Sequence, residues 1–297
     1  MINVHPQNAV VTGGTDGIGK EIARGLARAG HRLVLVGRDA QKGVAAAQEI
    51  LESTGSQGVR FIQANLSLVR ETHRLAREVV SHFPALHYLV HSAGIVRGRR
   101  VLTVESLESN FATNYLSRFT LTQKLLPVLN AAGQPKQAAR IVIISGAARN
   151  GKIHFDDVSL TNNFSTPRMV SQSCQANDVF TAELARRLAL GGSRGRITVT
   201  CLKVGVVKTN IRREFPLWMK WLVPLAMDPL LAQTAKEAAD PALRLLLSQE
   251  FEGITGALFL KIRKFRRIEP GTAEDPETGS RLWDLGLRLA DFALNRP

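Results

Sequence analysis

The stretch Thr12-Gly-Gly-Thr-Asp-Gly-Ile-Gly-Lys20 decides how the rest of the chain is organised. It follows the apolar run Ala9-Val-Val11 and leads into residues 21–28, where apolar side chains recur at helical spacing. A strand, a glycine turn and a helix therefore come in this order, which is the context that a nucleotide-binding turn requires. A purely structural turn is the alternative interpretation.

Three glycines of this turn are expected to have different roles. Gly13 can adopt backbone angles that other residues avoid, so that the turn is tight. Gly17 would let the backbone approach a pyrophosphate, and Gly19 would let the helix pack against its strand. The helix N-terminus then offers free N–H groups and a partial positive charge. We therefore predict that a dinucleotide phosphate binds at this turn.

The length and composition indicate one soluble domain. The 297 residues suit a single large α/β domain with a sizeable core, and the hydrophobic fraction of 44% is ordinary. No apolar run is long enough to span a membrane, and no signal or transit peptide is visible. The two cysteines, Cys174 and Cys201, fit neither a metal motif nor a disulfide framework. We therefore expect a cytoplasmic protein without a metal centre and without stable membrane insertion.

The formal net charge of +14 is partly concentrated in two basic clusters. Arg97, Arg99 and Arg100 form the first cluster, and five basic residues between 261 and 267 form the second. Such patches can attract nucleic acid, anionic lipid or an anionic substrate. No helix-turn-helix, zinc-finger or RNA-binding aromatic motif accompanies them, so a solvated surface is the preferred interpretation. We expect no nucleic-acid partner.

Strand-like apolar runs alternate with helical patterns along most of the chain. Beyond the first strand and helix, the expected strands are 32–37, 59–64, 86–90, 140–144 and 196–202, and the expected helices are 40–52, 68–82, 104–131 and 171–190. This alternation indicates a parallel sheet with helices on both faces, made doubly wound by right-handed crossovers. The sequence therefore predicts a Rossmann-type α/β fold whose ligands lie at the carboxyl ends of the strands.

Two segments after the last expected strand stand apart within this single domain of residues 1–297. Residues 208–235 crowd tryptophan, methionine and aliphatic side chains between prolines. We interpret them as a lid over a lipophilic ligand, with a packed helical insertion or a weak membrane contact as alternatives. Residues 269–280, rich in Gly, Pro, Thr and acid, are expected to form a surface loop before an amphipathic helix over 281–294.

Several further motifs match one known family over nearly the whole chain. They are Thr12 to Gly19, Val36-Gly-Arg-Asp39, Ala64-Asn-Leu66, the Ala-Gly pair in His91-Ser-Ala-Gly94, Asn110-Phe-Ala-Thr-Asn-Tyr-Leu116, Ala176-Asn177, Glu183-Leu-Ala-Arg-Arg-Leu188, Gly205-Val-Val-Lys-Thr209 and Leu282-Trp283. In these motifs the chain resembles the short-chain dehydrogenases/reductases, in the branch that includes retinol dehydrogenase-like and protochlorophyllide reductase-like enzymes. The resemblance implies a Rossmann fold and a nicotinamide cofactor.

The resemblance assigns cofactor-binding positions along the ends of the strands. They are Thr12, Gly13, Thr15, Gly17, Ile18, Gly19, Arg38, Asn65, Leu66, Ala93, Gly94 and Thr209. An acid at the end of the second strand would bind the ribose hydroxyls of NAD, whereas the guanidinium of Arg38 suits the 2′-phosphate of NADP. We expect NADP(H), as a structural or vestigial ligand, and an empty nucleotide site is the alternative.

The same resemblance implies a catalytic set that this chain has largely lost. In the family a tyrosine supplies the proton, a lysine four residues later lowers its pKa, a serine orients the carbonyl, and an asparagine completes a relay. Asn114 matches the asparagine, but Gly146, Val170 and Cys174 stand at the serine, tyrosine and lysine positions. Neither of the two tyrosines is followed four residues later by lysine. General acid–base catalysis contributes about 10²- to 10⁴-fold, so ordinary carbonyl reduction should be crippled.

The preferred hypothesis is therefore an enzyme that reuses the pocket without net redox chemistry. Dehydration, isomerisation or conjugate-addition cyclisation of a polyketide-like or terpenoid-like molecule in secondary metabolism needs a base and a proton donor, but no hydride. The candidate residues are Asn114, Ser145, His154, Asp156, Asp157, Ser171 and Lys203. Two alternatives are an NADPH-dependent carbonyl reductase with displaced acid–base groups and a non-catalytic binding module. The oligomeric state is left open between a monomer and a homodimer.

Overall fold

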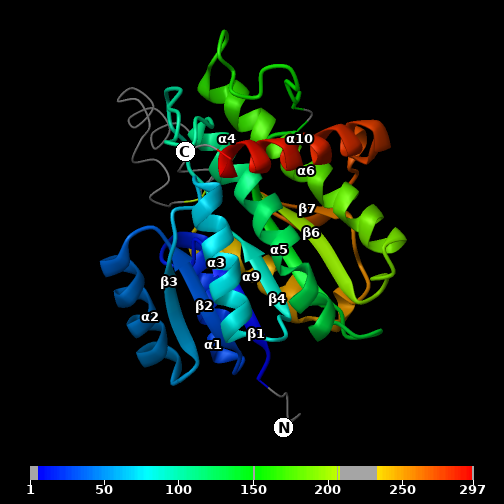
Figure 1. Cartoon of the computed structure of the whole chain (residues 1–297). Helices are drawn as coiled ribbons and strands as arrows, with labels where there is room; N and C mark the ends of the chain where they lie inside the picture. Colours follow the sequence, from blue (N-terminus) through cyan, green and yellow to red (C-terminus); the bar gives the residue numbers. More distant parts are fainter. Residues whose placement is uncertain (1–5, 150, 206, 208–232, 296–297) are drawn as a thin grey trace.

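The computed structural model describes residues 6–149, 151–205, 207 and 233–295, and they are built around one eight-stranded sheet (Figure 1). The spatial order of its strands is β3-β2-β1-β4-β5-β6-β7-β8. Their bounds are β1 Asn8–Thr12, β2 Arg32–Gly37, β3 Val59–Gln63, β4 Tyr88–His91, β5 Ala139–Gly146, β6 Ile197–Val204, β7 Ala257–Lys261 and β8 Phe265–Ile268. Only β8 runs antiparallel to its neighbour. The predicted doubly wound, mostly parallel sheet is confirmed.

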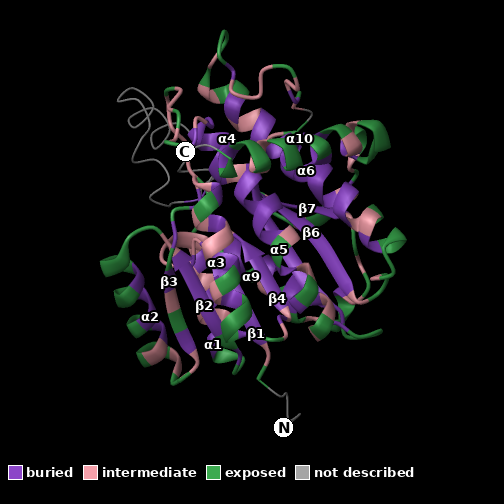
Figure 2. Cartoon of the chain, in the orientation of Figure 1, coloured by how far each residue is buried: buried purple, intermediate pink, exposed green. Residues whose placement is uncertain are grey.

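Helices cover both faces of this sheet, so its inner strands are buried between them, while β3 and β8 at the two edges are partly exposed (Figure 2). On one face lie α1 (Gly17–Arg28), α2 (Ala40–Thr54) and α9 (Ala235–Leu247). On the other lie α3 (Val69–His82), α5 (Ser117–Ala132), α6 (Thr166–Leu190) and α10 (Pro276–Leu294). The short helix α4 (Ser109–Phe111) and the π-helical turn η1 (Ala112–Leu116) lead into α5. Two 3₁₀ turns, η3 (Gln249–Phe251) and η4 (Gly271–Glu274), complete the described elements.

The direction of chain winding reverses between β1 and β4. Strand β1 pairs with β2 on one side and with β4 on the other, and all three run parallel. In open α/β sheets a dinucleotide lies in the crevice outside the carboxyl ends of the strands at such a switch point. The fold therefore places the glycine turn after β1 and the loop after β4 on the two sides of the predicted binding crevice.

Helix α10 lies across α5 and α6 and closes the core on that side (Figure 1). The indole of Trp283 meets the ring of Phe119 edge-on at 5.2 Å, and the guanidinium of Arg187 lies 4.2 Å from the centre of the Trp283 ring system. The phenol of Tyr115 donates a hydrogen bond to the carbonyl of Leu282 at 3.1 Å. Aromatic packing of this kind stabilises beyond the area it buries, so α10 is an integral part of the domain.

Two local predictions were wrong, and one hairpin was not predicted. Residues 104–108 are not helical, because Ser106 adopts a φ of 60° and Glu108 caps α4 through the N–H groups of Asn110 and Phe111. Residues 261–267 end β7 and form most of the unpredicted β7–β8 hairpin, while their basic side chains are largely exposed, as expected of a solvated surface. The expected loop 269–280 contains η4 and the first turn of α10, where Asp275 caps the helix through the N–H of Thr278.

Most of the predicted lid lies outside the described residues, so the interpretation of 208–235 stays a prediction. Of that segment, Gln233 forms a parallel bridge with Val207, and α9 begins at Ala235. None of the helices in the described part of the chain combines the length and the apolar character that crossing a membrane requires.

Candidate active site

The glycine turn after β1 folds tightly against the loop after β4. Gly13 has a φ of +68°, and a Cβ there would lie 2.7 Å from the backbone nitrogen of Ala93. A Cβ on Gly19 would lie 2.3 Å from the carbonyl oxygen of Gly13, so the helix start packs against the turn itself. Buried Thr12 fixes the same loop, since its hydroxyl accepts hydrogen bonds from the N–H groups of Ser92 and Ala93. The backbone at this turn is thus close-packed only because the glycines lack side chains.

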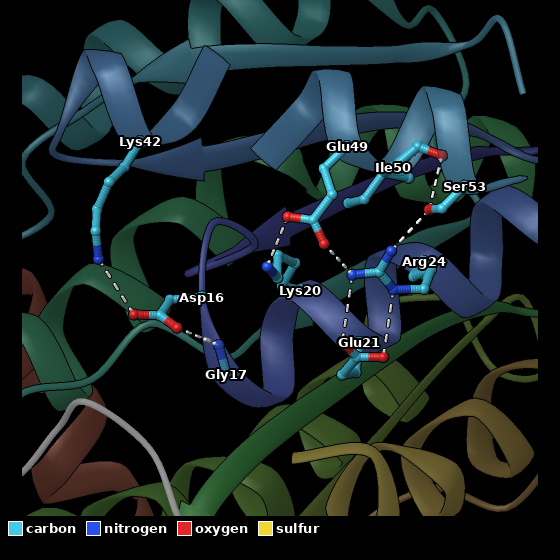
Figure 3. A network of polar contacts seen from close by, with 9 residues as sticks. All are labelled: Asp16, Gly17, Lys20, Glu21, Arg24, Lys42, Glu49, Ile50 and Ser53. Carbon is cyan, nitrogen blue, oxygen red and sulfur yellow. Dashed lines mark hydrogen bonds and ion pairs between the residues drawn. The ribbon is translucent and has the colours of Figure 1, made fainter. Parts of the chain in front are cut away.

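Polar contacts connect the glycine turn to α2 (Figure 3). Asp16 caps α1 by accepting a hydrogen bond from the N–H of Gly17, and its other carboxylate oxygen lies 3.3 Å from the ammonium of Lys42. Further along, Glu49 of α2 pairs with both Lys20 and Arg24 of α1, at 2.9 and 2.7 Å. These partly exposed pairs add little stability each, but together they orient α2 relative to the turn.

The residues predicted for the adenosine half lie at the ends of β2 and β3, beside the turn. Arg38 follows β2 and is exposed, while Thr15 packs against Gly37, where a Cβ would lie 2.8 Å from the Thr15 methyl group. Asn65 follows β3 and accepts hydrogen bonds from the N–H and hydroxyl of Ser67. Two predicted residues point inward instead: Leu66 is buried, and Ile18 is half-buried against the core. Thr209 lies outside the described residues.

Asn114 holds the loop after β4 from the π-helical turn. Its side-chain oxygen accepts a hydrogen bond from the N–H of Ile95 at 2.9 Å, and its amide donates to the carbonyl of the same residue at 2.8 Å. The amide of Asn177 on α6 in turn donates to the backbone carbonyl of Asn114 at 3.0 Å. Asn114 therefore fixes the loop that begins with the predicted Ala93-Gly94 pair, rather than lying free for proton transfer.

Arg118 is the main residue of this region that was not predicted from the sequence. It is only 5% exposed, and it donates to the carbonyls of Ala93 and Ile144 at 2.8 and 2.9 Å. It also donates to the side-chain oxygen of Asn177 at 3.2 Å. A lone basic residue in the otherwise uncharged start of the helix after Asn114 was the available signal. The guanidinium ties together the carboxyl ends of β4 and β5 and the middle of α6.

The predicted acid–base residues are not gathered into one open cluster. Ser145 lies opposite Lys203 in the β5–β6 register, and both are buried. Lys203 has no exposed surface, and its ammonium donates to the carboxylate of Asp178 at 2.5 Å. This ion pair keeps Lys203 inside the core and positions β6 against α6. The Lys203 side chain therefore does not reach the predicted binding crevice.

The remaining candidates lie in and beside the loop between β5 and α6. Half-buried His154 is held through its backbone N–H by Gln172, and Ser171 lies beside Gly151, where a Cβ would come within 2.7 Å of the Ser171 hydroxyl. Asp157 accepts hydrogen bonds from the N–H groups of Thr161 and Asn162, which lower its pKa. Asp156 is exposed. Within the described part of the chain, no hydrogen bond or ion pair engages the side chains of His154 and Ser171.

Comparisons with known proteins agree with this geometry. The family model for short chain dehydrogenases matches residues 7–159. Retinol dehydrogenase 13 of Mus musculus is 31% identical over 293 residues, which cover 97% of this chain and 85% of that protein. Polyprenol dehydrogenase of Homo sapiens is 31% identical over 249 residues, covering 84% of this chain and 74% of that protein.

The chain belongs to the short chain dehydrogenase family. The predicted kinship with the retinol dehydrogenase-like branch is also confirmed. A crystal structure of an uncharacterised protein from Mycobacterium paratuberculosis has the same fold, with a TM-score of 0.75 and 26% identity over 96% of this chain and 93% of that one.

Neither tyrosine of this short chain dehydrogenase reaches the carboxyl ends of the strands. Tyr88 begins β4, at the opposite edge of the sheet, and its phenol bonds to the side chain of Gln7. Tyr115 is fully buried and is held by Leu282, and burial raises its pKa above the usual range. Both phenols therefore serve packing, and no phenol from another segment replaces the side chain that the family resemblance expects at residue 170.

The residues that occupy the family's serine, tyrosine and lysine positions do lie at the predicted place. Gly146 ends β5 and is exposed, and a Cβ there would come 3.1 Å from the sulfur of Cys174 on α6. Val170 lies one helical turn before Cys174 and is half-buried. The end of β5 thus faces the thiol of buried Cys174, and the helical turn of α6 before it carries the apolar side chain of Val170.

Substituting Gly19 by alanine should weaken nucleotide binding at least about tenfold, because its Cβ would collide with the Gly13 carbonyl and open the turn. The measurement is titration of purified protein with NADPH. Gly30→Ala is the control, since Gly30, unlike Gly19, has a positive φ but nothing within 4 Å of its built Cβ. That variant should lose stability from backbone strain while keeping its affinity. Equal affinity of Gly19→Ala and wild type would contradict the role given to the turn.

Buried His91, the last residue of β4, should make the fold sensitive to acid. Its ring contacts the hydroxyl of Thr122 at 2.9 Å, and burial, followed by the charge of Arg118, lowers its pKa to about 3. Below an unfolded-state pKa near 6.5, only the unfolded chain takes up this proton, so stability present at high pH is lost as the pH falls. Between pH 7.5 and 5.5, His91 alone should remove about 1.4 kcal/mol of unfolding free energy.

Urea unfolding of His91→Asn at the two pH values tests this expectation. Between pH 7.5 and 5.5, the unfolding free energy of His91→Asn should fall by about 1.4 kcal/mol less than that of wild type. His82→Asn, at an exposed position on α3, is the matched control and should leave the drop unchanged. An identical drop in His91→Asn and wild type would show that His91 is not the group that titrates.

Proposed function

We propose that this short chain dehydrogenase binds NADP(H) across the glycine turn and holds a lipophilic small molecule beside it. The names of its relatives, retinol dehydrogenase and polyprenol dehydrogenase, support a lipophilic substrate class. The proposed reaction is a proton transfer on that molecule, as in dehydration, isomerisation or cyclisation, without net transfer of a hydride.

The residues of the turn fit a dinucleotide phosphate. Gly13 and Gly19 lack the side chains that would block the backbone. The first N–H of the twelve-residue helix α1 already donates to Asp16, contrary to the expectation of free N–H groups there, so a phosphate would have to displace that carboxylate or use the following N–H groups of the first turn. The exposed guanidinium of Arg38 at the end of β2 suits a 2′-phosphate, which it can meet with two parallel hydrogen bonds. Bound here, the nucleotide would supply a hydride donor or acceptor, and in our proposal it acts as a strut of the pocket.

One observation carries the proposed reaction type: the thiol of Cys174 lies at the end of β5, valine stands one helical turn before it at residue 170, and both phenols are held elsewhere. A carbonyl that accepts a hydride must also receive a proton, and no residue of the family's tyrosine type stands there to donate it. His154 and Ser171 are the proposed acid–base groups, since an imidazole can accept or donate a proton and a hydroxyl can relay one.

The test begins with the nucleotide that copurifies with the protein, released by denaturation and identified by chromatography. NADPH affinity is then measured for wild type and Arg38→Ala, with NADH as the comparison ligand. Loss of the 2′-phosphate contact should cost about tenfold in NADPH affinity and leave NADH affinity unchanged. Purified protein is finally incubated with retinal-like aldehydes and NADPH. Turnover that strictly consumes NADPH would remove the proposed reaction type.

A second candidate function is NADPH-dependent reduction of a lipophilic carbonyl, with Ser171 or a water as proton source. The relatives favour it, because their names are those of dehydrogenases. It predicts NADPH oxidation that depends on an added aldehyde and falls when Ser171 is replaced by alanine. A protein that only binds ligands would show neither activity. Replacing its proposed acid–base side chains would leave its ligand affinity unchanged.

A further inference from the structure

We infer that the buried guanidinium of Arg118 makes this site prefer the reduced nucleotide, NADPH, over the oxidised one, NADP⁺. The inference rests on the proposed nucleotide site and adds a charge-based selectivity to it. The oxidised nicotinamide ring carries a positive charge, whereas the reduced ring is neutral. A fixed cation close to the ring position therefore disfavours only the oxidised form.

Arg118 is charged and is not neutralised by a carboxylate. Its hydrogen-bond acceptors are two backbone carbonyls and the amide oxygen of Asn177. Its Nε is buried without a hydrogen-bond partner, and within the described ranges no carboxylate oxygen lies within ion-pair distance of it. The nearby carboxylate of Asp178 is bound to Lys203. Burial lowers the pKa of Arg118 to about 10, which still leaves the guanidinium protonated at neutral pH.

The guanidinium lies on the β4–β5 side of the switch point, in the half of the predicted crevice that is away from β2 and Arg38. Its Nη2 binds the carbonyl of Ala93, directly after β4, and its Nη1 binds the carbonyl of Ile144, near the end of β5. Gly94 above it is exposed, and a Cβ there would lie 3.8 Å from Nη2. A dinucleotide whose 2′-phosphate lies at Arg38 extends over the switch point toward this half. The cation thus lies just beneath the backbone surface on which the second half of the nucleotide would rest.

The charge at this place comes from a different residue than the family resemblance predicts. The resemblance places an ammonium at residue 174, where this chain has the neutral thiol of Cys174. Arg118 reaches the same region from α5 and also lowers the pKa of His91, at the end of β4. Unlike a lysine side chain that points into the cleft, it is fixed by three hydrogen bonds and shielded from solvent.

The expected selectivity follows from Coulomb's law. Two unit charges on the order of 10 Å apart, at an effective dielectric constant of about 20, repel enough to change a binding constant by about tenfold. Salt in solution screens this repulsion only weakly, because the guanidinium is buried. Wild-type protein should therefore bind NADPH about tenfold more tightly than NADP⁺.

The experiment measures dissociation constants for NADPH, NADP⁺ and 2′,5′-ADP, which lacks the nicotinamide, on wild type and three variants. In Arg118→Met the preference for NADPH should fall to about twofold or less, with 2′,5′-ADP affinity unchanged. Arg118→Lys keeps the charge and should keep most of the preference. Arg38→Met is the matched control, since it should weaken all three ligands together without changing the ratio of NADPH to NADP⁺.

Several outcomes would overturn the inference. Equal binding of NADPH and NADP⁺ by wild type refutes it without any variant, so it stays testable even if Arg118→Met does not fold. An unchanged preference in folded Arg118→Met refutes the role of this residue. If 2′,5′-ADP and both nucleotides fail to bind wild type, the proposed nucleotide site itself is wrong, which is a result distinct from equal binding.

Discussion

Installing tyrosine at residue 170 and lysine at residue 174 should give this protein NADPH-dependent aldehyde reduction at least about a hundredfold faster than wild type. The two positions lie one turn apart on α6, so both new side chains would project from one face of the helix. They would stand beside exposed Gly146 at the end of β5. The phenol would supply the missing proton, and the ammonium would lower its pKa.

The matched control is Val170→Phe with Cys174→Met, which adds similar bulk without the hydroxyl or the charge. It should show no gain in NADPH oxidation. Adding Gly146→Ser to the double variant should raise the rate further, since the new hydroxyl would orient the carbonyl. A Cβ there would lie 3.1 Å from the γ atom of residue 174, so the neighbouring side chain has to shift slightly. A cost in stability is expected, because the new ammonium lies in the region of Arg118. Equal rates for wild type, double variant and control would contradict our account of the lost catalytic set.

Replacing Asp178 by alanine should lower the unfolding free energy by about 3–5 kcal/mol, the largest loss that we expect from a single substitution in this chain. The ammonium of Lys203 has no exposed surface, and the Asp178 carboxylate 2.5 Å away is its partner. Burial raises the pKa of Asp178, although the charge of Lys203 opposes that shift. Removing the carboxylate leaves a buried cation that must lose its proton or unfold its surroundings.

Urea unfolding of three variants separates the ion pair from simple packing. Asp178→Ala and Lys203→Met should each be strongly destabilised, whereas the double variant Asp178→Leu, Lys203→Met should regain most of the loss, because an apolar pair needs no charge compensation. Single variants whose losses simply add in the double variant would show that the two side chains do not depend on each other.

The sequence predicted the sheet well, because alternating apolar runs and helical patterns are local signals. The glycine turn could be predicted equally well, since Gly13 and Gly19 permit contacts that a Cβ would block. The β7–β8 hairpin was missed because β8 carries a high density of basic side chains. Such a density is typical of a solvated surface segment. The start of α10 was missed for the opposite reason, because its capping aspartate and first proline resembled a loop.

The chemistry of the site was less predictable than its place. Asn114, Gly146 and Cys174 could be assigned by motif, and the structure brings the last two together. The Lys203–Asp178 ion pair joins β6 to α6. The hydrogen bonds of Arg118 join α5 to the loop after β4, to β5 and to α6. Such pairings depend on side chains far apart in sequence, and spacing along one chain cannot indicate them.

Helix α10 follows every strand of the sheet along the chain, and this order has a consequence for biosynthesis. While the ribosome is still translating, every strand of the sheet can be assembled before Trp283 and Leu282 have left the exit tunnel. The aromatic rings of Phe119 and Phe180, which α10 later covers, would face solvent during that interval. The nascent polypeptide thus exposes an apolar surface until α10 has emerged, and this is the moment at which a chaperone would be needed.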